Sequence, residues 1–178
     1  MIPMPAKLPF RVRRAGPRDA ETLARFRLLI SQELQHREGA PLTPAGRRHF
    51  RDLQRWIRDK MREHRLAGFL AVDPHGTAIA GCFVWLQEVP PRPELPGRYL
   101  PKIQAMYTVP AWRKRGAASA VLEATVRWAD SRGCERIMLR ASTMGEKLYA
   151  ANGFVRVTEM QRELSPPRNR RRRARRRL

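Results

Sequence analysis

Cysteine is scarce in this sequence, and so is any feature that would direct the chain to a membrane. The two cysteines, Cys82 and Cys134, form neither a metal-binding spacing nor a disulfide framework, so we interpret both as small core or half-buried thiols. No apolar run approaches membrane-spanning length, and residues 1–7 lack the apolar centre of a signal peptide. These absences favour a globular protein of the reducing cytoplasm.

Acidic residues are also few: 16 Asp and Glu stand against 37 Lys and Arg, which gives a net charge of +21. Removing the eight arginines of residues 168–178 leaves +13 for residues 1–167. Such an excess favours a polyanionic partner, such as RNA, DNA or an acidic protein surface. We expect residues 165–178 to be a disordered tail that is either merely solvated or makes non-specific nucleic-acid contacts. No helix-turn-helix, zinc-finger or RNA-recognition pattern points to sequence-specific binding.

The known phosphate-loop patterns, G-x-x-x-x-G-K-[ST] and G-x-G-x-x-G, are absent, yet residues 109–119 have the composition of a phosphate site. Pro110 ends a strand-like run, a basic turn of Arg113, Lys114 and Arg115 follows, and small residues begin a helix-like run at Ala117. The free N–H groups at a helix N-terminus bind phosphate, and small residues let it approach closely. The turn is therefore either a pyrophosphate cradle or an ordinary basic helix cap.

Three features in this part of the chain resemble the GCN5-related N-acetyltransferases, a family that binds acetyl-CoA. Arg113-x-x-Gly116-x-Ala118 is similar to the R/Q-x-x-G-x-G/A signature, and residues 148–154 resemble the L-Y-x-x-x-G-F element. A longer series of residues occurs in family order and spacing: 106–110, 132–134, 139–142, 144–145, 148–149, 153–154 and 159–160. Two positions depart from many relatives, which have Gly at Ala118 and Asn at Ser142.

The resemblance covers about residues 10–164 and implies one domain there, after an extension at 1–9 and before the tail at 165–178. The implied fold class is α/β with a mixed α+β sheet: the acyl-CoA N-acyltransferase fold, a central mixed sheet flanked by about four helices. Hydrophobic periodicity predicts the order βααβββαβαβ. The strands are expected at residues 10–13, 66–72, 79–89, 103–109 and 137–139 and from 154 onward. The helices are expected to begin near residues 17, 44 and 117, with a short one that ends at Gly153.

The resemblance also implies which residues bind acetyl-CoA, here a cosubstrate. The strand residues Met106, Tyr107, Thr108 and Val109 would hold the pantetheine arm by backbone contacts, with Ser142 nearby. The pyrophosphate would meet Arg113, Lys114, Arg115, Gly116, Ala117, Ala118 and Ser119. No metal is implied.

Direct attack by an amine on a thioester needs an acid for the leaving thiolate, a base for the amine and donors for the oxyanion. Tyr149 matches the family tyrosine and is our candidate acid, with a packing role as the alternative. Glu88 is the candidate base, and Glu33 and Glu38 are candidates to line the acceptor pocket. Each of these glutamates is otherwise an ordinary surface carboxylate.

Two functions therefore stay open. The first is acetyl-CoA-dependent N-acetyl transfer to a primary amine, carried by a small molecule or a protein. The second is a basic nucleic-acid- or ribosome-associated protein that retains the fold as a binding module. Many relatives are homodimers, but no residue pattern here marks a dimer face.

Overall fold

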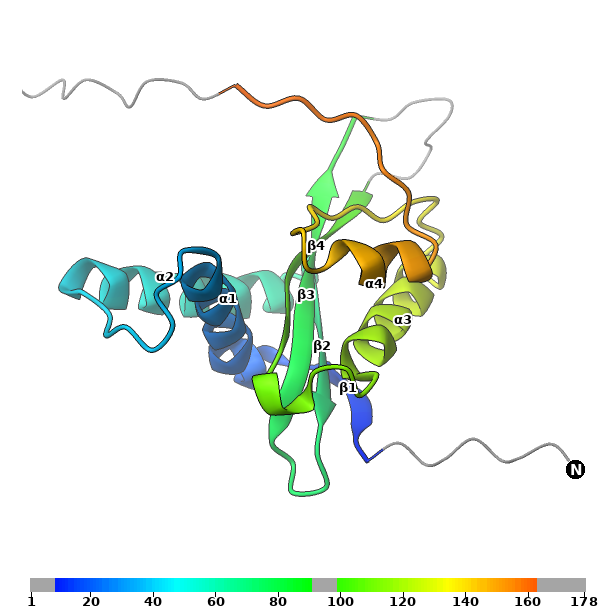
Figure 1. Cartoon of the computed structure of the whole chain (residues 1–178). Coiled ribbons are helices and arrows are strands. Elements are labelled where there is room, and N and C mark those ends of the chain that lie inside the picture. Colours follow the sequence, from blue (N-terminus) through cyan, green and yellow to red (C-terminus); the bar gives the residue numbers. More distant parts are fainter. Residues whose placement is uncertain (1–8, 91–98, 163–178) are drawn as a thin grey trace, which may run out of the picture.

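Four antiparallel strands form the central sheet of the computed structural model, which describes residues 9–90 and 99–162 (Figure 1). They pair in chain order: β1 (Arg11–Ala15), β2 (Leu66–Val72), β3 (Ala78–Glu88) and β4 (Tyr99–Thr108). β2 is buried throughout and β3 over most of its length, as their unbroken apolar runs predicted. β4 lies at one edge of the sheet, next to β3.

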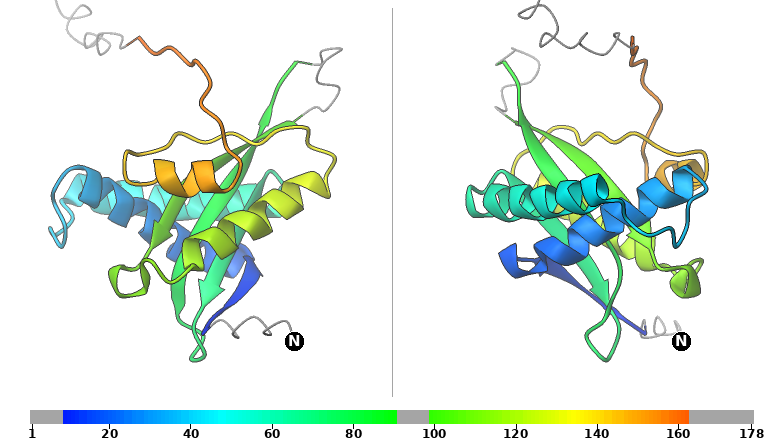
Figure 2. Two further views of the ribbon diagram at one scale, coloured as in Figure 1. Left: turned by 45° about the vertical axis from the view of Figure 1, so that its right-hand side comes forward. Right: turned by 90° about the vertical axis from the view of Figure 1, so that its left-hand side faces the viewer.

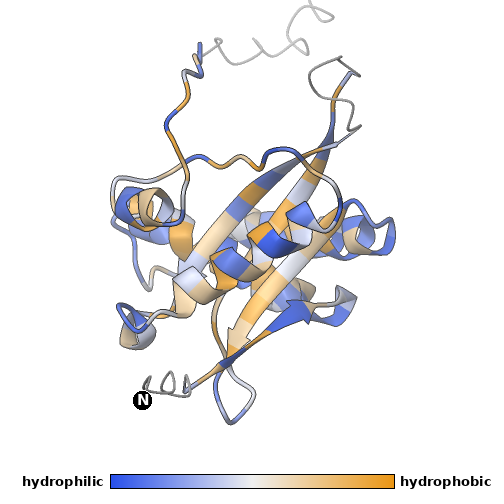
Figure 3. Ribbon diagram, turned by 90° about the vertical axis from the view of Figure 1, so that its right-hand side faces the viewer, coloured by the Kyte–Doolittle hydropathy of each residue, from blue (hydrophilic) through white to orange (hydrophobic). Residues whose placement is uncertain are grey.

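Helices cover both faces of this sheet (Figures 1 and 2). One face carries α1 (Ala20–Leu34) and α2 (Pro44–Arg62), whose core residues include Leu23, Phe26 and Ile57. The other carries α3 (Ala117–Asp130) and α4 (Glu146–Ala151); Val121 and Leu122 of α3 are fully buried there. Two short 3-10 helices, η1 (Pro17–Asp19) and η2 (Pro110–Trp112), precede α1 and α3. Figure 3 shows apolar residues concentrated in the strands between these layers.

Local sequence signals account for the predicted helix starts. The Thr43 hydroxyl accepts a hydrogen bond from the Gly46 amide at 3.1 Å, and Pro44 occupies the first turn of α2. The Asp19 carboxylate accepts from the Gly16 amide at 2.8 Å and pairs with Arg13 at 2.7 Å. These contacts satisfy amides that a helix end otherwise leaves without partners.

A β-bulge bends β4 in its C-terminal half. Gly81 pairs with Tyr107 and Phe83 with Gln104, so that Ala105 and Met106 lie opposite the single residue Cys82. Ala105 adopts a positive φ of 57° at this point. The neighbouring strand requires glycine, because a Cβ on Gly81 would lie 2.5 Å from Leu70 Cδ2 and 2.8 Å from the Phe69 carbonyl oxygen.

Two expected strands are not formed in the structure. At residues 137–139 a single parallel bridge joins Lys102 and Met138, with hydrogen bonds of 2.7 and 2.9 Å around Met138. The run after Phe154 has no regular structure over the described residues to 162, and Val155 and Val157 are 83% and 68% exposed. Alternating apolar residues favour a strand, but a strand forms only where a neighbouring edge supplies hydrogen bonds. The proline-rich loop near residues 90–96 and the arginine-rich tail lie largely or wholly outside the described residues.

Candidate functional site

The turn before α3 leaves the N-terminus of that helix open. Lys114 and Gly116 both have positive φ, at 59° and 81°, and Gly116 is the residue that precedes the first turn of α3. A Cβ on Gly116 would meet nothing within 4 Å, so this point faces open space. The amides of Ala117, Ala118 and Ser119 belong to the first helical turn, where N–H groups have no intrahelical acceptor. They form a group of donors at the positive end of the helix dipole.

The basic side chains of this turn are used differently from one another. The Arg113 guanidinium donates to Glu33 Oε1 at 2.5 Å and to the Thr108 carbonyl at 3.1 Å, and it lies over the ring of Tyr107. The Arg115 guanidinium lies 5.5 Å from the centre of the Trp112 ring. Arg113 is therefore paired with the Glu33 carboxylate on α1. This pairing largely neutralises the positive charge that Arg113 was expected to add to the turn.

The outer edge of β4 runs toward the same turn. The Val109 amide donates to the Ile79 carbonyl at 2.8 Å, and its carbonyl accepts from Trp112 at 2.8 Å. Because N–H groups alternate in direction along a regular strand, the Thr108 amide, next to that of Val109, faces away from β3. Thr108 thus suits the expected backbone contacts, Met106 lies in the bulge where the regular ladder is interrupted, and the Val109 amide is already bonded inside the fold. Tyr107 is 6% exposed, and its hydroxyl donates to Glu33 at 3.2 Å.

Tyr149 on α4 packs against the same face of the sheet as α3. Its ring contacts Phe154 edge-on, with centroids 5.9 Å apart. Burial, with a smaller effect of the nearby Cys82, raises the pKa of Tyr149 to about 12. The phenol is therefore protonated at neutral pH and able to donate. The Ser142 hydroxyl accepts from the Gly145 amide at 3.2 Å, so it holds the turn before α4, beside Tyr149.

The three candidate glutamates lie in different places. Glu88 ends β3, where its carboxylate pairs with Arg65 at 3.2 Å. It follows Cys82 by six residues along the strand, which corresponds to about 20 Å. Glu33 is held by Arg113 and Tyr107, and Glu38 is exposed in the connection between α1 and α2. The fold thus gathers the β4 edge, the Gly116 turn and Tyr149, but it does not bring Glu88 to them.

Sequence reasoning missed the link from Glu33 to Arg113, which joins residues 80 positions apart. It also missed the bulge at Ala105 opposite Cys82. No local signal marks the pair of Glu33 and Arg113, since either residue alone resembles an exposed charge. The expected strand at residues 103–109 contains no glycine or proline that would mark the bulge.

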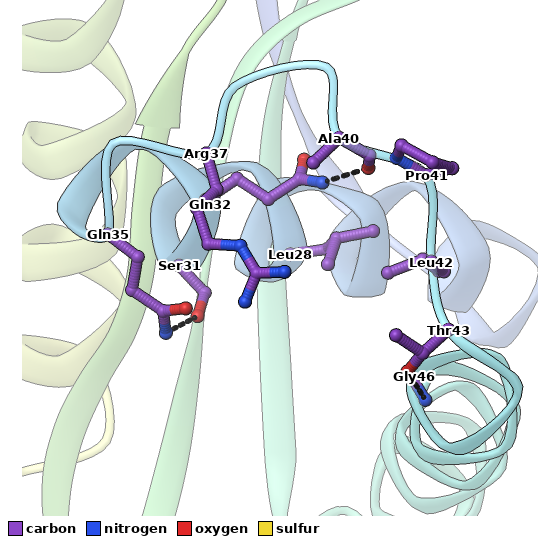
Figure 4. Close-up of a pocket in the computed structure, with 10 residues that line it drawn as sticks. All are labelled: Leu28, Ser31, Gln32, Gln35, Arg37, Ala40, Pro41, Leu42, Thr43 and Gly46. Carbon is purple, nitrogen blue, oxygen red and sulfur yellow. Dashed lines mark hydrogen bonds between the residues drawn. The ribbon is translucent and has the colours of Figure 1, made fainter.

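A separate pocket of about 170 Å³ lies between α1 and the segment leading to α2 (Figure 4). Its wall includes hydrogen bonds from Gln32 to the Ala40 carbonyl and from Gln35 to Ser31. It is lined by Leu28, Ser31, Gln32, Gln35, Arg37, Ala40, Pro41, Leu42, Thr43 and Gly46. None of these is a predicted site residue, so the pocket is distinct from the cradle.

Neither a metal site nor a membrane-spanning helix is found in the part of the chain that the structure describes. Over residues 9–90 and 99–162, no three His, Cys, Asp or Glu side chains are grouped as metal ligands. The helices within those ranges are each too short or too polar to cross a bilayer.

Comparison with known proteins identifies the family. Residues 30–154 match the acetyltransferase (GNAT) family, and the chain belongs to it. Among curated proteins, none matches this chain. The predicted acetyltransferase fold, a sheet flanked by helices, is confirmed.

Solved structures share this fold over most of the chain. A GCN5-related N-acetyltransferase from Ralstonia eutropha JMP134 is 23% identical with a TM-score of 0.74, covering 87% of this chain and 98% of its own. A predicted acetyltransferase from Clostridium acetobutylicum, solved with acetyl-CoA, is 25% identical with a TM-score of 0.71, covering 88% and 96%. AAC(6')-Iy, in complex with the bisubstrate analogue CoA-S-monomethyl-acetylneamine, is 19% identical with a TM-score of 0.64, covering 88% and 98%.

Proposed function

We propose that this protein transfers the acetyl group of acetyl-CoA to a primary amine by direct attack in a ternary complex. One observation carries the proposal: in a chain of the acetyltransferase family, the open Gly116 turn, the edge of β4 and the protonated Tyr149 occur together. A protein that used the fold only as a binding module would need neither the open turn nor a buried phenol.

The residues around the α3 N-terminus suit the anionic end of acetyl-CoA. The amides of Gly116, Ala117, Ala118 and Ser119 would hold the pyrophosphate, and the side chain of Lys114 would add positive charge. Gly116 leaves space where a side chain would otherwise stand. Along the edge of β4, Met106 and Thr108 would hold the pantetheine arm through backbone groups.

The cosubstrate supplies a thioester that an amine attacks directly. As the new C–N bond forms and the C–S bond breaks, Tyr149 would donate its phenol proton toward the leaving sulfur. The attacking nitrogen must lose a proton, and we assign this to water, with Glu88 as the candidate terminal acceptor. Glu88 lies about 20 Å along β3 from Cys82, which faces the bulge of β4. A chain of waters would therefore have to connect the attacking nitrogen with the Glu88 carboxylate.

We expect the acceptor to be an amine of low positive charge, either a small molecule or a protein amine. Structural neighbours include aminoglycoside acetyltransferases, one of them in complex with sisomicin at 12% identity. The net charge of +13 over residues 1–167 disfavours a polycationic acceptor of that kind here. We further propose a cytoplasmic location, which the two unpaired thiols support.

Release of the CoA thiol in the presence of a panel of amines tests the proposal. We expect turnover with at least one neutral or singly charged amine. Tyr149→Phe should lower kcat about 10²- to 10⁴-fold, the range for loss of one general acid, while the KM for acetyl-CoA stays within about threefold. Glu88→Gln should lower kcat without changing the thermal stability of the acetyl-CoA complex. Equal kcat values for wild type and Tyr149→Phe would remove the acid from the mechanism.

A further inference from the structure

The outward face of α2 carries six arginines in one stripe. The helix advances 100° per residue, so these side chains fall within an arc of about 100° along a length of about 22 Å. All six are exposed. The apolar residues Ile57 and Met61 are buried on another side of the helix. The arginine stripe consists of Arg47, Arg48, Arg51, Arg55, Arg58 and Arg62.

Few carboxylates among the described residues neutralise the arginine stripe. Arg55 pairs with Asp52 at 3.5 Å and Arg62 with Asp59 at 3.7 Å, both as exposed pairs along the helix. For the other four arginines, no carboxylate of a described residue lies within 4.0 Å. Positive charges three and four residues apart on one helix face repel each other, which costs stability. The stripe therefore lowers the stability of the free helix, and a polyanion would relieve the repulsion.

The position of α2 makes the arginine stripe accessible. The helix lies beside α1 on one face of the sheet, and its N-terminal half projects beyond the strands (Figures 1 and 2). The cradle lies at the start of α3, whose core residues pack on the opposite face of the sheet. The stripe is thus separate from the proposed acetyl-CoA site.

We infer that the arginine stripe of α2 binds the phosphodiester backbone of a nucleic-acid duplex without reading its sequence. Guanidinium groups form bidentate contacts with phosphates, and a straight row of them matches a regular array of charge along a duplex. The aromatic residues Phe50 and Trp56 of α2 pack against the core and not in the stripe, so no base could stack there, which disfavours single strands. Leu53, Ile57 and Met61 also face the core, which leaves no apolar residue of the stripe to enter a lipid interface.

Titration of the full-length protein with fluorescent duplexes tests this inference. The stripe variant is R48Q/R51Q/R58Q, which removes three arginines that have no carboxylate partner and keeps helix propensity. The matched control, R11Q/R132Q/R136Q, removes three exposed charges from β1 and from the segment after α3 and leaves the tail intact. Each protein is titrated with a 20-base-pair RNA duplex and the corresponding DNA duplex over a range of salt concentrations.

Each lost phosphate contact should reduce the slope of log affinity against log salt by about 0.9. We expect the stripe variant to lose between two and three units of slope and at least tenfold in affinity at physiological salt. The control should lose less than one unit of slope. Comparison of the RNA and DNA duplexes identifies which nucleic acid the stripe binds. The duplex that binds wild type more tightly should also show the larger loss of affinity in the stripe variant.

Equal losses in the two variants would overturn the inference, because binding would then follow net charge alone. Tighter binding to polyglutamate or to anionic vesicles than to either duplex would overturn it as well. Thermal unfolding shows whether the stripe variant is folded. Because the substitutions remove like charges, its melting temperature should be equal to or higher than that of wild type. Transfer of acetyl groups to a small amine should be the same in wild type and stripe variant.

Discussion

Burial determines what Tyr149 and Cys82 can do near neutral pH. Both groups are neutral there, and burial, which raises the pKa of each to about 12, suppresses the ionised form further. For the phenol, burial thus reinforces the protonated form that the proposed mechanism needs. For the thiol, it removes the thiolate that a nucleophile or metal ligand would need. Burial thus favours the proposed role of Tyr149 as a proton donor and disfavours a nucleophilic or metal-binding role for Cys82.

The two cysteines should therefore differ in reactivity. At pH 8, a pKa of about 12 leaves on the order of one Cys82 thiol in 10⁴ ionised, and its side chain is fully buried. Cys134 is partly exposed, although burial also raises its pKa. A disulfide reagent should label one thiol of the native protein rapidly, and Cys134→Ala should abolish that phase. Rapid labelling of both thiols in the native protein would contradict the burial of Cys82.

At the scale of elements, α1 and the turn before α3 are tied together through Glu33. Its carboxylate accepts from Arg113, which also bonds the Thr108 carbonyl, and from the hydroxyl of Tyr107 in β4. The Glu33 side chain is 19% exposed and that of Arg113 is 40% exposed, so solvent screens part of the attraction. The network fixes the start of the cradle to a helix on the other face of the sheet.

Glu33→Gln tests this tie. Loss of the charged partner should lower stability by about 1 kcal/mol, the scale of a charge-assisted bond partly exposed to water, and should weaken acetyl-CoA binding. Glu38→Gln, at an exposed position in the connection that follows α1, is the matched control and should change neither quantity. Urea unfolding and ligand titration provide the two readouts. A Glu33 variant as stable as wild type would show that the tie is not part of the fold.

Elements that depend on local signals could be predicted from the sequence, and those that depend on distant partners could not. The start of α3 was predictable because Pro110, Gly116 and the small residues are local signals that act within one turn. The role of Arg113 was not, because its partner Glu33 is 80 residues away. The strand expected after Phe154 does not form. The alternation of apolar and polar residues shows that one face of such a strand could be buried, but it does not show whether a neighbouring strand edge is available for pairing. That edge, on β4, has a single bridge at Lys102 and Met138 within the described residues.

For the whole molecule, charge and fold point to two separate surfaces. The face with α3 and α4 carries the proposed acetyl-CoA site, and the outward side of α2 carries the arginine stripe. The family match spans residues 30–154 and so includes both surfaces, but the proposed acetyl-CoA site does not use the arginine stripe. The helical spacing of the arginines in residues 47–62 already indicates a basic helix face, and the structure adds that all six side chains are exposed.

The central claim is that acetyl-CoA binds at the Gly116 turn, and thermal unfolding with added acetyl-CoA tests it most directly. A ligand that binds only the folded state stabilises it by about 2.7 kcal/mol at 100 times its Kd, which corresponds to about 5 to 10 °C for a chain of this size. We expect this shift for wild type and for Gly133→Glu. Gly133 also has a positive φ, 67° against 81° for Gly116, and open surroundings, but it follows the opposite end of α3. Gly116→Glu should show no shift, because its carboxylate would occupy the phosphate position. A shift as large in Gly116→Glu as in wild type, or none in wild type, would contradict the account.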